Sequence, residues 1–196
     1  MRRSARAIAT VVAIAALLAL SGCSGSQGTT AGSPAATTTP GAHMAGPVID
    51  VHISQAAVNA TPKRWVLTSP KSAVTSYLDW TTYAYRTGQS IFATRTMSGD
   101  EEVRVDSYIQ LNIQKQRLID QKLDSITFGK PSTGPTSTLV SAKEDWTYSY
   151  LSIDTGNKVL EGPFKASYDT TYTVVKNGNG DWVVDSVKAT PRGTVK

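Results

Sequence analysis

The spacing of hydrophobic and polar positions changes once along the chain, near Leu123. Between Thr61 and that point, apolar residues recur every three or four positions, which is typical of amphipathic helices. Beyond it they alternate with polar residues to the end of the chain, as in strands with one buried face. Helices followed by a run of strands predict an α+β fold, in which N-terminal helices pack on one face of a curved antiparallel sheet.

The first helix is expected to begin at Ser69-Pro70 and to end near Gly88. Serine is a good N-cap, and proline is tolerated in the first turn, where its missing N–H has no helical partner. The inward face of this helix is expected to carry Val74, Tyr77, Leu78, Thr81, Ala84 and Tyr85. Trp80 and Tyr83 lie partly off this stripe and are interpreted as core, with a partner-facing patch as the alternative. A short helical piece with Ile91 and Phe92 follows.

A second long helix is predicted from Ser98 to about Leu123. Ser98-Gly99-Asp100-Glu101 fits a capping box, in which the serine and the glutamate each bond the other's backbone amide. Acidic residues are favourable at a helix N-terminus, so a calcium site is not needed to explain them. The inward stripe is expected to consist of Val105, Tyr108, Ile109, Ile113 and Ile119.

Turn-forming clusters divide the remainder into five candidate strands. They are residues 124–130, 137–142, 144–153, 164–176 and 181–189, with the second and third as one long bent strand in the alternative. Alternation places Trp146, Tyr148 and Tyr150 on one face of their strand, and Tyr168, Tyr172 and Val174 on one face of theirs.

The N-terminus has the three-part layout of a secretory leader. Arg2, Arg3 and Arg6 precede an apolar run from Ala7 to Leu20, and the only cysteine follows. Leu20-Ser21-Gly22-Cys23 resembles the lipobox of bacterial lipoproteins, which implies a diacylglycerol thioether on Cys23, acylation such as palmitate, and removal of residues 1–22. The alternatives are a plain signal peptide and an uncleaved anchor helix. We expect a lipid-anchored protein at the extracytoplasmic face of the cell membrane.

Residues 23–60 are predicted to be the lipidated cysteine and a flexible tether, and residues 61–196 the folded domain. From Ser24 to about Gly46 the chain is mostly Ser, Thr, Gly, Ala and Pro, without Phe, Tyr or Trp, so it can bury little apolar surface. Pro47 to Ala60 is ambiguous, because Val48, Val51 and Ile53 could form a short strand.

Composition excludes several classes of function. Part of the formal net charge of +5 belongs to the leader arginines, and no basic run interleaved with aromatics occurs, so no nucleic-acid partner is expected. The single cysteine is assigned to the lipid, and the two histidines, His43 and His52, lie before the predicted domain. Neither a nucleophilic triad nor a metal-ligand spacing is present, and no cofactor is expected.

The last two strands suggest a family. Tyr168 to Val175, a Gly-Asn turn and Asp181 to Val187 resemble the closing strands of the nuclear transport factor 2-like cone fold, and more narrowly of exported actinobacterial versions. The resemblance covers roughly Trp65 to Pro191. It implies a cone-shaped domain, and since this fold hosts isomerases, dehydratases, cyclases and interaction domains, it does not assign a function.

We therefore expect a non-catalytic binding module anchored to the membrane, with an envelope protein or a second copy as its partner. The alternative is a carrier of a small molecule or lipid in an aromatic-lined pocket, whose candidate residues are Tyr77, Tyr108, Trp146, Tyr148 and Tyr172. An enzyme would need a carboxylate base, Asp79 or Asp145, beside a phenol from one of these tyrosines or Tyr83. A sealed pocket with a buried carboxylate favours the enzyme, a deep apolar pocket the carrier, and a filled pocket with an exposed apolar sheet face the protein partner.

Overall fold

The computed structural model describes residues 50–193. In chain order the helices are α1 (Gln55–Asn59), α2 (Pro70–Thr87), two short 3-10 turns η1 (Ser90–Phe92) and η2 (Thr94–Thr96), and α3 (Gly99–Gln114). The strands are β1 (Arg117–Phe128), β2 (Ser132–Thr133), β3 (Thr138–Ser152), β4 (Val159–Lys176) and β5 (Trp182–Pro191). The lipobox and most of the expected tether lie outside the described residues.

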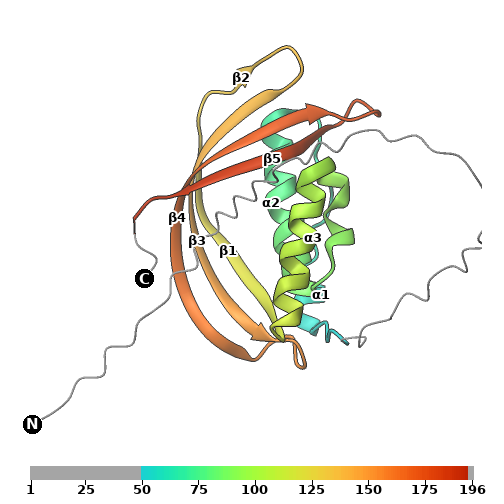
Figure 1. Ribbon diagram of the computed structural model, residues 1–196, viewed down its shortest axis with the longest axis vertical. Helices are drawn as coiled ribbons and strands as arrows, with labels where there is room; N and C mark the ends of the chain where they lie inside the picture. Colours follow the sequence, from blue (N-terminus) through green and yellow to red (C-terminus); the bar gives the residue numbers. More distant parts are fainter. Residues whose placement is uncertain (1–49, 194–196) are drawn as a thin grey trace, which may run out of the picture. The chain divides into compact units, whose positions relative to one another are not determined.

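The strands form one antiparallel sheet in the order β1-β3-β4-β5, with β2 paired to the start of β3. The sheet curves, and its concave face is covered by α2 and α3 (Figure 1). In the register, Glu144 lies opposite Tyr168 and Tyr148 opposite Phe164, so these side chains share the concave face. The predicted fold class, α+β with helices packed on a curved antiparallel sheet, is confirmed.

Helix α2 begins where its sequence predicts. The Ser69 side chain accepts a hydrogen bond from the Ser72 amide, the Ser72 hydroxyl accepts one from the Ser69 amide, and Pro70 opens the helix. Gly88 ends it in the left-handed conformation, with φ of 71°, which glycine adopts without steric cost.

Two predictions for the next helix are wrong. Ser98 is the N-cap of α3, but its hydroxyl donates to the Asp185 carboxylate at 2.9 Å instead of bonding an α3 amide, and the Glu101 carboxylate is engaged elsewhere. The helix ends at Gln114 rather than near Leu123. Ile119 lies in β1, where it pairs with Tyr150, because eleven residue pairs with β3 outweigh a modest local helix preference.

The strands differ in extent from those predicted. Residues 138–152 form the single long strand β3, as in the alternative prediction, whereas β1 starts seven residues before its predicted start at residue 124 and β4 starts before residue 164. Residues 50–60 belong to the folded part rather than to the tether. They hold helix α1 instead of a strand, and the His52 amide donates to the Ile153 carbonyl at 3.1 Å. The fold therefore begins before the expected boundary at residue 60.

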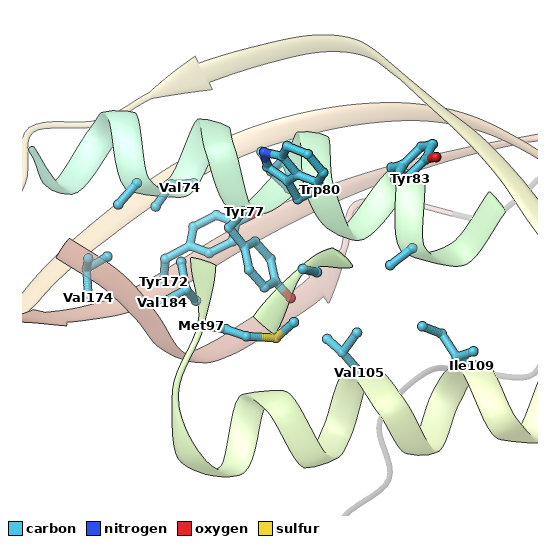
Figure 2. Close-up of a cluster of buried hydrophobic side chains, with 14 of the residues drawn as sticks. Val74, Tyr77, Trp80, Tyr83, Met97, Val105, Ile109, Tyr172, Val174 and Val184 are labelled. Atoms are coloured by element: carbon cyan, nitrogen blue, oxygen red, sulfur yellow. The ribbon is translucent and has the colours of Figure 1, made fainter. Parts of the chain in front are cut away.

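The core lies between the two long helices and the concave face of the sheet (Figure 2). It combines aliphatic residues with aromatic rings, among them Val74, Tyr77, Trp80, Tyr83, Met97, Val105, Ile109, Tyr172, Val174 and Val184. Trp80 and Tyr83 are only 5% and 8% exposed, which makes them core residues and not a patch that faces a partner.

Candidate functional site

A buried carboxylate lies in the concave face of the sheet. Glu144 of β3 is 4% exposed and accepts two hydrogen bonds, one from the Tyr172 phenol and one from Trp146 Nε1, the latter at 2.9 Å. Trp146 is two residues further along the strand, and Tyr172 comes from the neighbouring strand β4. Alternation along β3 and pairing with β4 therefore position all three side chains on one face.

A second buried carboxylate, Glu101, lies in the first turn of α3 and is 2% exposed. Its Oε1 accepts a hydrogen bond from the Tyr77 phenol of α2. Arg104, one turn further along α3, donates from Nε to Oε2 at 2.8 Å and from Nη2 to Oε1 at 2.5 Å. The carboxylate thus has a bidentate arginine partner as well as a phenol.

Both phenols are held in the protonated state. Burial, followed by the Glu144 charge, raises the pKa of Tyr172, and burial followed by the Glu101 charge raises the pKa of Tyr77 well above its usual value. A phenolate beside a carboxylate in a dry interior would be unfavourable, so each phenol remains a donor. Each glutamate therefore accepts hydrogen bonds from one phenol and from one nitrogen-bearing side chain of the protein.

The five aromatic residues predicted to line a pocket differ in how deeply they are buried. Tyr77 and Tyr172 are 4% and 1% exposed and lie in the core of the domain. Trp146, Tyr108 and Tyr148 are half-buried. The interior is filled because the two tyrosine rings meet edge to face, with centroids 6.1 Å apart.

Sequence reasoning missed both glutamates. The inward orientation of Glu144 could have been predicted from the alternation of side chains along a strand. Glu144 lies two and four residues before Trp146 and Tyr148, so all three face the same side of the sheet. Glu101 gave a misleading signal, because its position three residues after Ser98 fits a capping box.

Half-buried aromatic side chains gather at the end of the concave face formed by the start of β1, the end of β3 and the start of β4. We call this set the aromatic end: Tyr108, Tyr148, Tyr150, Phe164 and Arg117. The ring centroids of Tyr148 and Phe164 are 5.3 Å apart, and those of Tyr148 and Tyr150 are 5.9 Å apart. The Arg117 guanidinium lies over the Tyr150 ring at 3.6 Å from its centroid, a cation–π contact.

The electrostatics of the aromatic end differ from those of the buried pairs. Burial, followed by the proximity of Tyr150, raises the pKa of Tyr108, so its phenol stays neutral at physiological pH. The Arg117 guanidinium is 4.0 Å from the Glu161 carboxylate, whose side chain is 58% exposed. The aromatic end therefore presents aromatic rings, phenol hydroxyls and one cation, without a buried carboxylate of its own.

The convex face of the sheet is polar. Its β3 and β4 positions are mostly Ser, Thr, Lys and Asp, namely Ser141, Lys143, Asp145, Thr147, Ser149, Lys165, Ser167, Asp169, Thr171 and Thr173. Asp145 accepts hydrogen bonds from Ser125 at 2.7 Å and Ser167 at 2.6 Å, and from Arg192 at 3.1 Å. The Ser167 hydrogen bond, followed by that of Ser125, lowers the Asp145 pKa. Asp145 is thus remote from the interior, and this face is not the apolar surface expected for a partner.

Asp79, the other candidate base, lines a cavity of about 690 Å³ between α2, β1 and residues 60–66. Burial raises its pKa. No tyrosine lines this cavity in the described part of the chain, so the expected pairing of a carboxylate with a phenol is not formed there.

Residues 50–193 contain no cluster of three or more His, Cys, Asp or Glu side chains arranged to hold a metal ion. Within the same residues, no helix has the length and hydrophobicity required to cross a bilayer.

Comparison with known proteins concerns the fold alone. No protein-family model matches the chain, and no curated protein matches it. Among solved structures it is similar to the intermembrane space region of the chloroplast protein ARC6, with a TM-score of 0.54 and 12% identity over 66% of this chain and 99% of that one. An uncharacterized cystatin-like protein from Caulobacter vibrioides matches with a TM-score of 0.41 and 13% identity over 63% of this chain and 90% of that one. A ketosteroid isomerase-like protein from Erwinia carotovora atroseptica matches with a TM-score of 0.40 and 13% identity over 65% and 97%.

Proposed function

We propose that the protein is a lipid-anchored cell-envelope protein whose cone-like domain is a non-catalytic binding module, with the aromatic end as its partner-binding surface. The observation that carries the proposal is the aromatic end itself. Tyr, Trp and Arg are enriched in the residues that dominate protein–protein binding energy, whereas Ser and Thr are under-represented there. Rings with few rotatable bonds contribute contact area at a low entropic cost.

The filled interior supports binding at the surface over catalysis inside the cone. Glu101 and Glu144 are each engaged by a phenol and by a nitrogen donor, so a substrate would have to displace internal hydrogen bonds to reach either one. Leaving such a carboxylate unsatisfied in the interior is costly. For the same reason, carriage of a ligand between Tyr77 and Tyr172 is not favoured.

Membrane anchoring rests on the sequence. The resemblance of Leu20-Ser21-Gly22-Cys23 to a lipobox supports a diacylglycerol on Cys23, and two acyl chains give stable membrane attachment where one does not. The proposal of an actinobacterial lipoprotein of the nuclear transport factor 2-like type rests on the same leader and on the closing strands. We expect Cys23→Ser to abolish incorporation of an alkyne-labelled fatty acid and to release the protein from the membrane fraction. Retention of label in this variant would contradict the anchor.

The partner surface is tested separately, with envelope preparations depleted of the endogenous protein. Two double variants of the full chain are compared with the wild type. The aromatic variant carries Tyr150→Ala and Phe164→Ala, and the convex variant carries Ser141→Ala and Lys143→Ala as a matched control on the convex face. We expect the aromatic pair alone to abolish co-purification of a stoichiometric partner, while circular dichroism shows that all variants are folded. Loss of the partner in the convex variant, with retention in the aromatic one, would contradict the proposal.

A further inference from the structure

The cavity beside α2 is lined by both apolar and charged residues. It measures about 690 Å³, within the range of small-molecule sites, and lies on the flank of the domain between α2, β1 and residues 60–66. Its apolar lining includes Leu78, Leu123 and Trp146, and its charged lining consists of Lys63, Arg64, Lys122 and Asp79. A ligand that fits both kinds of wall has an apolar body and a charged group.

Residues 60–66 are fixed in place over α2, so the cavity is a built feature. The Val66 amide donates to the Ser76 hydroxyl at 2.8 Å, and this hydroxyl donates back to the Val66 carbonyl at 3.2 Å. Trp65 stacks on Trp80 of α2 with ring centroids 4.6 Å apart. These contacts hold the neighbouring Lys63 and Arg64 backbone at the rim.

The apolar wall is fixed as well. The Trp146 indole N–H is bonded to the buried Glu144 carboxylate, which orients the ring that lines the cavity. Gln121 on β1 donates to the Thr82 hydroxyl of α2 at 3.1 Å, so the two walls are joined at the lining itself. A wall with fixed rotamers binds at a lower entropic cost than a mobile one.

Positive charge exceeds negative charge around the cavity. Among the lining residues, Lys63 and Arg64 are opposed by Asp79 alone. Lys122 does not enter this balance, because it pairs with Thr147 of the convex face and its ammonium lies 3.5 Å from the Asp124 carboxylate. The charge balance selects an anionic group over a cationic one.

We propose that this cavity binds a small amphipathic anion, with the apolar body against Leu78, Leu123 and Trp146 and the anionic group toward Lys63 and Arg64. The proposal does not depend on the partner surface at the aromatic end, because the two sets of residues are different. It also does not depend on lipid attachment.

Isothermal titration calorimetry with dodecanoate, below its micelle concentration, tests the proposal on the full chain carrying Cys23→Ser. We expect saturable binding, and at least about fivefold weaker binding of dodecyltrimethylammonium, which has the same chain length and the opposite charge. Lys63→Ala with Arg64→Ala should weaken dodecanoate binding by a similar factor. Lys143→Ala with Lys188→Ala, which removes the same charge from the convex face, should leave it unchanged.

Filling the cavity provides the second readout. Thr75 is an exposed residue of α2 that lines the cavity, so Thr75→Trp should abolish dodecanoate binding while the domain remains folded by circular dichroism. Absence of dodecanoate binding to the unmodified cavity would overturn the proposal. Equal binding of the cationic probe, or an equal loss with the convex-face pair, would overturn the anion preference, and full binding by the Thr75→Trp variant would overturn the location.

Discussion

Tyr77 and Tyr172 meet edge to face in the centre of the domain, 6.1 Å apart between ring centroids, and their phenols bond to two different buried glutamates. The first glutamate, Glu101, comes from α3, and the second, Glu144, from β3. The contact between the two rings therefore connects two buried phenol–carboxylate hydrogen bonds, one in the helical layer and one reaching the sheet. Such a network stabilises one arrangement strongly only while every member is satisfied.

Tyr172→Phe removes one of the two donors to Glu144 without changing the shape of the ring. A buried acceptor that loses a partner costs about 1–3 kcal/mol, so the free energy of unfolding in urea should fall by that amount. Tyr148→Phe, on the same face but half-buried, should change it by less than about 0.5 kcal/mol. Equal effects of the two substitutions would show that the Tyr172 hydroxyl is not needed to satisfy Glu144.

Tyr77 and Arg104 should act as a unit, because both donate to Glu101. A double-mutant cycle with Tyr77→Phe and Arg104→Ala should give an interaction energy of about 0.5–3 kcal/mol in unfolding experiments. Tyr77→Phe combined with Lys188→Ala on β5 provides the reference cycle and should be additive. An additive Tyr77–Arg104 cycle would mean that Glu101 does not couple them.

Stability should decline in alkaline solution. Burial raises the pKa of Tyr77 and Tyr172, and that of Tyr85 to about 12, whereas an unfolded phenol ionises at about 10. Above pH about 10 the unfolded state loses protons that the folded state keeps, so unfolding becomes easier as the pH rises toward the folded pKa values. Each such phenol contributes up to about 1.4 kcal/mol per pH unit. Urea titrations across this window should show the decline, and a flat profile would contradict it.

The sequence predicted the layers of the fold better than the boundaries between them. Ser69-Pro70 and Gly88 determine the ends of α2 through local chemistry, which a sequence reveals. The end of α3 depends on Gln116, whose φ of 56° turns the chain back into β1. Glutamine has no special preference for that conformation, so only the pairing of β1 with β3 selects it.

Gln116 thus offers a direct test of this turn. A non-glycine residue in the left-handed region carries a steric cost of about 1 kcal/mol, so Gln116→Gly should raise the free energy of unfolding by up to that amount. Lys115→Gly, one residue earlier and with φ of −86°, should lower it by roughly 0.5–1 kcal/mol. A loss of stability in both variants would show that the Gln116 side chain contributes more than its backbone costs.

The candidate site was predictable only in part. Alternation placed Trp146, Tyr148 and Tyr150 on one face, as the structure has them. It did not reveal how far each ring is buried, because that depends on how the helices cover the sheet. Asp145 and Glu144 are adjacent in sequence, yet one faces the convex surface and the other the interior. Which of the two faces inward follows from the alternation of side chains along the strand, because Glu144 lies two residues before the inward-facing Trp146.

Site-specific photo-crosslinking can show whether the aromatic end binds the partner. A photoreactive phenylalanine analogue is placed at Phe164, in the aromatic end, or at Lys143, on the convex face, in the full chain in intact cells. We expect one discrete adduct from position 164, absent when Tyr150→Ala is added, and none from position 143. An adduct from position 143 alone would place the binding surface on the convex face and contradict the proposed role of the aromatic end.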